Sequence, residues 1–210
     1  MLTARGRSHI ISSMRKLIGA VTILLVFSSS GWAQGLKEGD RQRLLAHLDM
    51  TEAWLVSELD ALSPDQLSFH MTPESWSILE VVEHLVIAEL QYWQQALNSM
   101  KQSPAGKKPE ATDAGILWYG IDRTNRQKTG EARVPKGKLP DIRSSLAEFR
   151  RLRKTIREYA ATTTEDPRSR MLLEGNMDVY QWLLMISTHS QRHILQIREI
   201  KADASYPRLR

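Results

Sequence analysis

The pattern of hydrophobic and polar positions along the chain predicts four helices and no strand. Apolar residues recur at intervals of three and four in segments that begin near residues 40, 78, 142 and 178, which is the spacing of a single helical face. The first two segments end near Leu62 and Asn98, and the last ends before Pro207. The predicted buried faces consist of Leu44, Leu48, Thr51, Leu55, Leu59 and Leu62; Ile78, Val81, Leu85, Ala88 and Tyr92; Ile142, Leu146, Phe149, Leu152 and Ile156; and Trp182, Met185, Ile186, Ile197 and Ile200.

Capping signals mark the starts of three of these helices. Ser77 is followed three residues later by Glu80, and Asp178 is followed at the same distance by Gln181. Both pairs match the capping box, in which the first side chain and the fourth satisfy each other's backbone N–H groups. Asp141 is the predicted N-cap of the third helix.

A long connection separates the second helix from the third. Residues 101–140 contain nine prolines and glycines and no strong helical period, whereas the other connections are shorter. We therefore predict an all-α fold over residues 36–207, a four-helix bundle with a long crossover between helices 2 and 3. Bundles of this kind build metal sites from side chains that face inward from neighbouring helices.

Two histidines in the last helix are the strongest chemical signal. His189 and His193 are four residues apart, so their imidazoles lie one turn apart on the same face. That face is the apolar stripe, where an imidazole is costly to bury unless its nitrogens are bonded. A divalent metal ion bound by both would remove this cost, with Gln196 orienting one of the rings.

A third ligand must come from another helix, because two ligands hold a divalent ion poorly. His84, two turns inside the second helix and on its core side, is the first choice, and His47 on the first helix is the second. If Glu80 or Glu83 replaced a histidine, the resulting two-histidine, one-carboxylate set would suit iron. His70 lies in a loop, and nothing in the sequence pairs it with an acid or a nucleophile.

The N-terminus has the pattern of a secretory signal. Residues 1–16 carry four basic residues and no acid, and residues 17–27 form an apolar run. This run is well short of the ~20 residues that a membrane-spanning helix needs, and Gly31 and Ala33 supply the small residues of a cleavage site. We predict a signal peptide over residues 1–33, cleaved after Ala33, and a periplasmic or secreted protein. Met14 is an alternative start, and an uncleaved anchor is the alternative reading.

The charge balance and the absence of cysteine limit the kinds of ligand and reaction that the sequence supports. The chain has 29 basic and 24 acidic residues, but the leader contributes four and none, which leaves 25 and 24. Residues 101–143 stay basic, with ten lysines and arginines against five acids, which fits an anionic ligand or a solvated loop. No interleaved basic and aromatic pattern indicates nucleic-acid binding. The absence of cysteine excludes disulfides, a protein thiolate nucleophile and cysteine-ligated metal.

Several segments together resemble the DinB/YfiT-like superfamily. They are residues 76–85 (WSILEVVEHL), residues 134–137 (VPKG), residues 180–197 (YQWLLMISTHSQRHILQI) and residues 201–207 (KADASYP). The resemblance implies a four-helix bundle whose histidine triad, here His84, His189 and His193, binds a divalent ion, zinc or nickel. Some relatives are thiol S-transferases that use bacillithiol or mycothiol, and others have been named metal-dependent hydrolases.

These observations lead to one main hypothesis and two alternatives. The main hypothesis is an exported metal-dependent hydrolase that acts on a small-molecule substrate, with no catalytic acid or base evident in the sequence. The first alternative is a non-catalytic metal-binding or stress-response protein of the envelope, and the second is a thiol S-transferase. Export weakens the second, because low-molecular-weight thiols of that kind are cytosolic. We expect no nucleic-acid partner and no stable membrane anchor after cleavage, while a homodimer is the expected assembly if the chain associates.

Overall fold

The computed structural model describes residues 35–126, 128–139, 141–173 and 175–208, so the predicted signal peptide lies outside the described residues. The elements are α1 (Glu38–Leu59), α2 (Pro64–Ser68), α3 (Ile78–Met100), α4 (Asp113–Ile121), the 3-10 turn η1 (Glu131–Arg133), α5 (Ile142–Thr162), the 3-10 turn η2 (Pro167–Ser169) and α6 (Val179–Ala202). Within these residues the only strand-type pairing is one isolated bridge. None of the helices described is long and apolar enough to cross a membrane.

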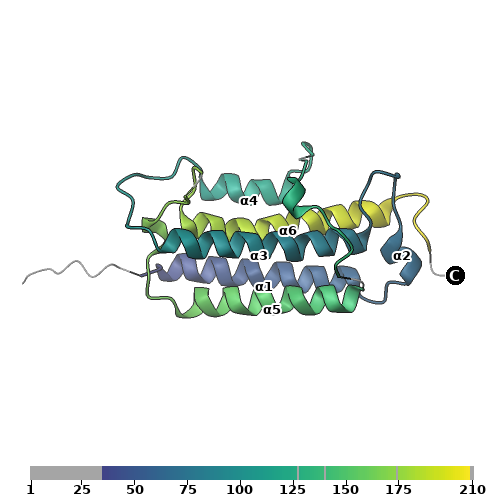
Figure 1. Cartoon of the computed structure of the whole chain (residues 1–210), viewed down its shortest axis with the longest axis horizontal. Helices are drawn as coiled ribbons and strands as arrows, with labels where there is room; N and C mark the ends of the chain where they lie inside the picture. Colours follow the sequence, from purple (N-terminus) through teal and green to yellow (C-terminus); the bar gives the residue numbers. More distant parts are fainter. Residues whose placement is uncertain (1–34, 127, 140, 174, 209–210) are drawn as a thin grey trace, which may run out of the picture. The chain divides into compact units, whose positions relative to one another are not determined.

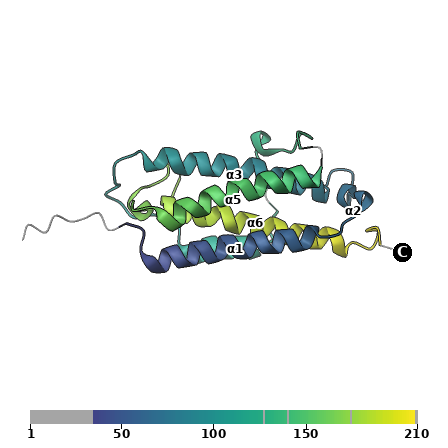
Figure 2. The same ribbon diagram turned by 90° about the horizontal axis from the view of Figure 1, so that it is seen from below.

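The four long helices α1, α3, α5 and α6 form the predicted bundle (Figure 1). Each of α1 and α3 packs against both α5 and α6. The helices α3 and α5 run in the same direction (Figures 1 and 2), so the chain must return along the length of the bundle between them. The long connection over residues 101–140 is the consequence of this topology.

The predicted caps are present in the structure. Ser77 with Glu80 and Asp178 with Gln181 form complete capping boxes at the starts of α3 and α6. The carboxylate of Asp141 accepts a hydrogen bond from the backbone N–H three residues on, at the start of α5. These bonds satisfy N–H groups that have no partner inside the helix, and each helix therefore begins where its cap lies.

The core of the bundle consists of two apolar clusters with a polar layer between them. The clusters are centred on residues such as Leu48 and Ile186 at one end and Leu85 and Phe149 at the other. In this layer, hydrogen bonds join one buried polar residue from each long helix, and these are Thr51, Glu89, Arg153 and Ser190. The sequence pattern did not reveal this layer, although Glu89 and Arg153 lie at helical spacing from their apolar neighbours.

The crossover contains a helix that we did not predict. The nine residues of α4 lie along α6 (Figure 1), on a stretch interrupted by two glycines that weaken its helical pattern. A Cβ on Gly120 would lie 3.1 Å from the backbone oxygen of Thr188, which is closer than an ordinary van der Waals contact, so glycine suits this close approach of α4 to α6. Because α4 covers another side of α6, α6 is buried around most of its circumference rather than along one stripe.

Candidate metal centre

The three predicted histidines come together in the interior of the bundle. His84 lies in the second turn of α3, and His189 and His193 lie in the middle of α6, which packs against α3. His84 and His189 are buried, and His193 is half-buried. Three imidazoles from two helices are thus collected at one point.

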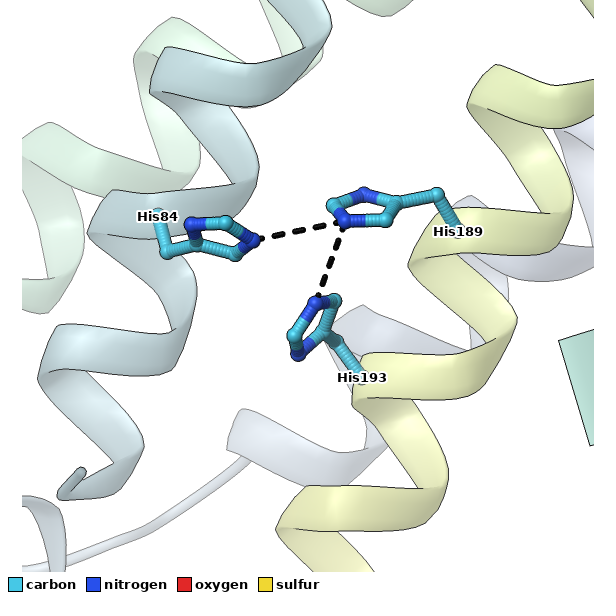
Figure 3. A group of neighbouring side chains, drawn as sticks. All are labelled: His84, His189 and His193. Atoms are coloured by element: carbon cyan, nitrogen blue, oxygen red, sulfur yellow. Dashed lines mark hydrogen bonds between the residues drawn. The ribbon is translucent and has the colours of Figure 1, made fainter. Parts of the chain in front are cut away.

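The three rings present the same nitrogen to one another (Figure 3). The Nε2 atom of His189 lies 3.3 Å from Nε2 of His84 and 3.2 Å from Nε2 of His193. All three ligand atoms lie within 4.8 Å of one another. For Zn–N bonds of about 2.1 Å in tetrahedral geometry, two ligand nitrogens are about 3.4 Å apart. The spacing of the Nε2 atoms therefore fits a single transition-metal ion.

Hydrogen bonds on the outer nitrogens fix the proton positions of two of the rings. Nδ1 of His84 lies 2.8 Å from the backbone oxygen of Arg133, and Nδ1 of His193 lies 2.8 Å from Oε1 of Gln196. Both oxygens only accept, so each Nδ1 donates and each neutral ring keeps a lone pair on Nε2. Nδ1 of His189 is buried without a hydrogen-bond partner among the described residues, and its ring meets Tyr92 edge to face.

Burial keeps the three imidazoles neutral. It lowers the pKa of His84, although the hydrogen bond that Nδ1 of this ring donates to the Arg133 carbonyl acts in the opposite direction. Burial and nearby positive charge lower the pKa of His193 to about 3 and that of His189 well below its usual value. A neutral imidazole is the form that binds metal. His84 and His193 therefore both direct an Nε2 lone pair toward Nε2 of His189, and a cation at the centre of the three nitrogens would stabilise this arrangement.

The other candidate ligands from the sequence are engaged elsewhere. His47 lies 2.8 Å from the hydroxyl of Ser187 and is not part of the cluster. The Glu80 carboxylate accepts the N–H of Ser77 in the capping box. Among the described residues, no carboxylate joins the three histidines within ligand distance. The two-histidine, one-carboxylate alternative is therefore not the arrangement present.

His70 lies near an acid that the sequence did not pair with it. Its Nδ1 lies 2.6 Å from the backbone oxygen of Ser75 and 3.6 Å from the Glu80 carboxylate, so a nearby acid does exist. The ring is exposed and lies outside the triad, and this contact belongs to the loop that precedes α3. The expectation that His70 is not a ligand is consistent with its position.

Glu83 has a role that the sequence did not suggest. Its buried carboxylate accepts backbone hydrogen bonds from Lys136, Gly137 and Lys138, at 2.8 to 3.3 Å. Gly137 adopts a positive φ of 66°, which lets the loop turn its N–H groups toward one acceptor. This loop follows Arg133, whose carbonyl holds His84. Glu83, the neighbour of His84 in α3, thereby positions the segment that orients its ring.

We expect Glu83→Gln to loosen this loop and weaken metal binding. An amide offers one acceptor oxygen instead of two and places an NH₂ group against backbone N–H donors. Losses of about 10- to 100-fold in metal affinity are typical when a partner of a ligand is disturbed. Competition with a chromogenic chelator would measure the affinity, with Glu148→Gln on α5 as a control outside the site. Equal affinity in the wild type and Glu83→Gln would show that the loop does not support His84.

The triad lies at the inner end of a cavity of about 480 Å³. Trp76 packs against His84, with 4.8 Å between the ring centroids, and forms one wall. Tyr119 from α4 and the basic segment that follows it form another. Trp118, in contrast, is 61% exposed and is not among the residues that line this cavity. Only the packing of α4 against α6 reveals that the crossover contributes to the site.

Comparisons with known proteins agree with this description. A family profile described as the DinB superfamily matches residues 29–197. The uncharacterized protein YuaE of Bacillus subtilis (strain 168) is 27% identical over 153 residues, covering 71% of this chain and 91% of that protein. The solved structure of YfiT from Bacillus subtilis, described as a probable metal-dependent hydrolase with an unusual four-helix bundle topology, matches with a TM-score of 0.52 and 16% identity. The matched region covers 80% of this chain and 89% of the YfiT chain. At this identity the structural likeness establishes the fold.

Proposed function

The chain belongs to the DinB superfamily, and on that premise we propose that it is a metal-dependent hydrolase with His84, His189 and His193 as its metal ligands. The family match agrees with the resemblance found in the sequence. The observation that carries the proposal is the convergence of three Nε2 atoms at the inner end of an open cavity. A site used only for structure is usually closed by four protein ligands, whereas three ligands leave a position for substrate or water.

The chemistry requires little from the protein beyond the ligand set. A divalent ion held there, zinc or nickel in our proposal, would supply Lewis acidity to polarise a substrate oxygen or to lower the pKa of a water molecule. The chain's own residues hold the imidazoles and shape the cavity. Burial raises the pKa of Tyr92 and Tyr119, so both phenols stay protonated near neutral pH and can donate hydrogen bonds in the cavity.

Metal removal and restoration test the proposal. Purified protein would be stripped with a chelator, reloaded with zinc or nickel, and assayed on a panel of esters, amides and thiol acceptors. We expect hydrolysis of at least one ester or amide that falls to background on stripping and returns on reloading. A protein that binds metal but turns over no ester or amide would contradict the hydrolase proposal. Thiol transfer would then favour the S-transferase alternative, and no turnover would favour a storage or sensing role.

We also propose that the protein acts outside the cytosol, which rests on the leader pattern of residues 1–33. Expression in a bacterial host, cell fractionation and N-terminal sequencing would test this. The expected result is an envelope or secreted protein that begins at Gln34. A cytosolic protein that begins at Met1 or Met14 would contradict export, and it would remove the objection to a cytosolic thiol as co-substrate.

A further inference from the structure

The cavity above the triad is lined by an excess of positive charge. Its walls include the cationic residues Arg123, Arg126, Lys128, Arg133 and Arg192, whereas Glu74 and Glu199 are the only acids among the described residues that line it. The Arg123 guanidinium contacts the Glu199 carboxylate through Nε at 2.6 Å and Nη2 at 2.9 Å, so these two charges offset each other. The remaining cations outnumber the one remaining acid by three.

Arg192 is a buried cation in this wall. Its guanidinium donates to the backbone oxygens of Tyr119, Asp122 and Asn125 and lies 4.9 Å from the centroid of the Tyr119 ring. Carbonyl oxygens satisfy its donors but carry no net charge. Among the described residues no carboxylate forms a salt bridge with this guanidinium, and the Asp122 and Glu199 carboxylates interact with its charge only from beyond 4.0 Å. A buried charge of this kind favours an anion in the adjoining space.

Arg133 lines the cavity and also contacts the metal centre. Its carbonyl holds Nδ1 of His84, and its guanidinium lies 5.5 Å from the centroid of the Tyr92 ring. In the part of the chain that the structure describes, its side chain makes no salt bridge. The planar guanidinium therefore keeps its donors available beside the triad. Such a group binds both oxygens of a carboxylate or phosphate in parallel.

We propose that the cavity accepts a substrate that carries a carboxylate or phosphate group, and that Arg133 is the main contact for this oxyanion. Exposed Arg126 and Lys128 at the mouth add to the positive field that attracts such a molecule. This inference rests on the proposed function in taking the cavity as the substrate site. It adds the charge of the substrate and a specificity-determining residue.

A matched pair of ligands separates recognition of charge from recognition of shape. Binding of 4-fluorobenzoate and of neutral 4-fluorobenzamide would be measured by fluorine NMR in the metal-loaded protein and again after metal removal. We expect the benzoate to bind at least about tenfold more tightly than the amide in both forms, because guanidinium contacts do not require the metal. Inorganic phosphate, added as a competitor, would distinguish a site that prefers phosphate from one that prefers carboxylate.

Variants locate the contact. Arg133→Gln should weaken 4-fluorobenzoate binding about tenfold and leave 4-fluorobenzamide unchanged, whereas Arg143→Gln, an exposed residue on α5 outside the cavity, should change neither. Metal content measured on the same samples shows whether the Arg133 carbonyl still supports His84. Equal affinity for the acid and the amide would overturn this inference, and so would an Arg133→Gln variant that binds 4-fluorobenzoate as tightly as the wild type does. Neither result would contradict the proposed metal centre. A preference for the anion in a protein that never binds metal would instead overturn the proposed function alone.

Discussion

Replacing His189 or His193 with alanine is expected to remove the metal ion from the purified protein. The wild type should contain about one transition-metal ion per chain, and each variant less than about a tenth of that. The reason is the number of ligands, since each substitution leaves two imidazoles where the Nε2 atoms now form a set of three. Elemental analysis of protein purified without added chelator measures the content directly.

The matched control for these variants is His47→Ala. His47 also projects from a bundle helix and is partly buried, but it contacts Ser187 and lies outside the triad. Thermal unfolding with and without added zinc separates loss of the site from loss of the fold, because a ligand stabilises only a protein that binds it. We expect zinc to raise the Tm of the wild type and of His47→Ala but not that of the two triad variants. Unchanged metal content in both His189→Ala and His193→Ala would refute the assignment.

Removing one partner of the buried ion pair between α3 and α5 is expected to cause the largest loss of stability. Nε of Arg153 lies 2.9 Å from the Glu89 carboxylate, and both side chains are fully buried. The guanidinium also donates to Thr51 of α1 and Ser190 of α6, so all four long helices meet here. Glu89→Leu or Arg153→Met would leave one buried charge without its partner, which costs about 3–5 kcal/mol in free energy of unfolding.

The double variant Glu89→Leu with Arg153→Met tests the cause of this loss. If uncompensated charge is responsible, replacing both partners with apolar residues should recover most of the stability lost in either single variant. Arg157→Met is the matched control on α5, because Arg157 pairs with Asp49 at an exposed position and its loss should change stability little. Urea unfolding of the four variants gives the free energies. Single variants as stable as the wild type would contradict the expected role of the pair.

Local features of the fold were predictable because they depend on residues close together in the chain. The capping boxes at Ser77 and Asp178 each involve residues three apart, and the helices begin there as predicted. The spacing of His189 and His193 likewise placed two imidazoles on one face before any contact was known. The expectation of a four-helix bundle with a long crossover also agrees with the arrangement of α1, α3, α5 and α6.

Features that join distant parts of the chain were predicted incompletely or not at all. Glu83 was considered as a ligand, but its carboxylate is used by the backbone of a loop more than fifty residues away. The pairing of Glu89 with Arg153 could not be predicted, because the sequence shows only that each charged residue lies on the apolar face of its helix. The sequence does not predict the helix α4, because two glycines weaken its pattern and its stability comes from packing against α6.

The sequence by itself determined where the long helices begin, which of their faces are apolar, and that two histidines share one face. These properties follow from bonds and side-chain directions that repeat within a few residues. The sequence named His84 as the first choice for the third ligand, and the tertiary structure decided between it and His47. It also decided that the Arg133 carbonyl orients the His84 ring and that a basic cavity opens beside the triad. The physical reason is that these contacts depend on which helices pack together and in which direction they run, and the periodicity of a single helix carries neither.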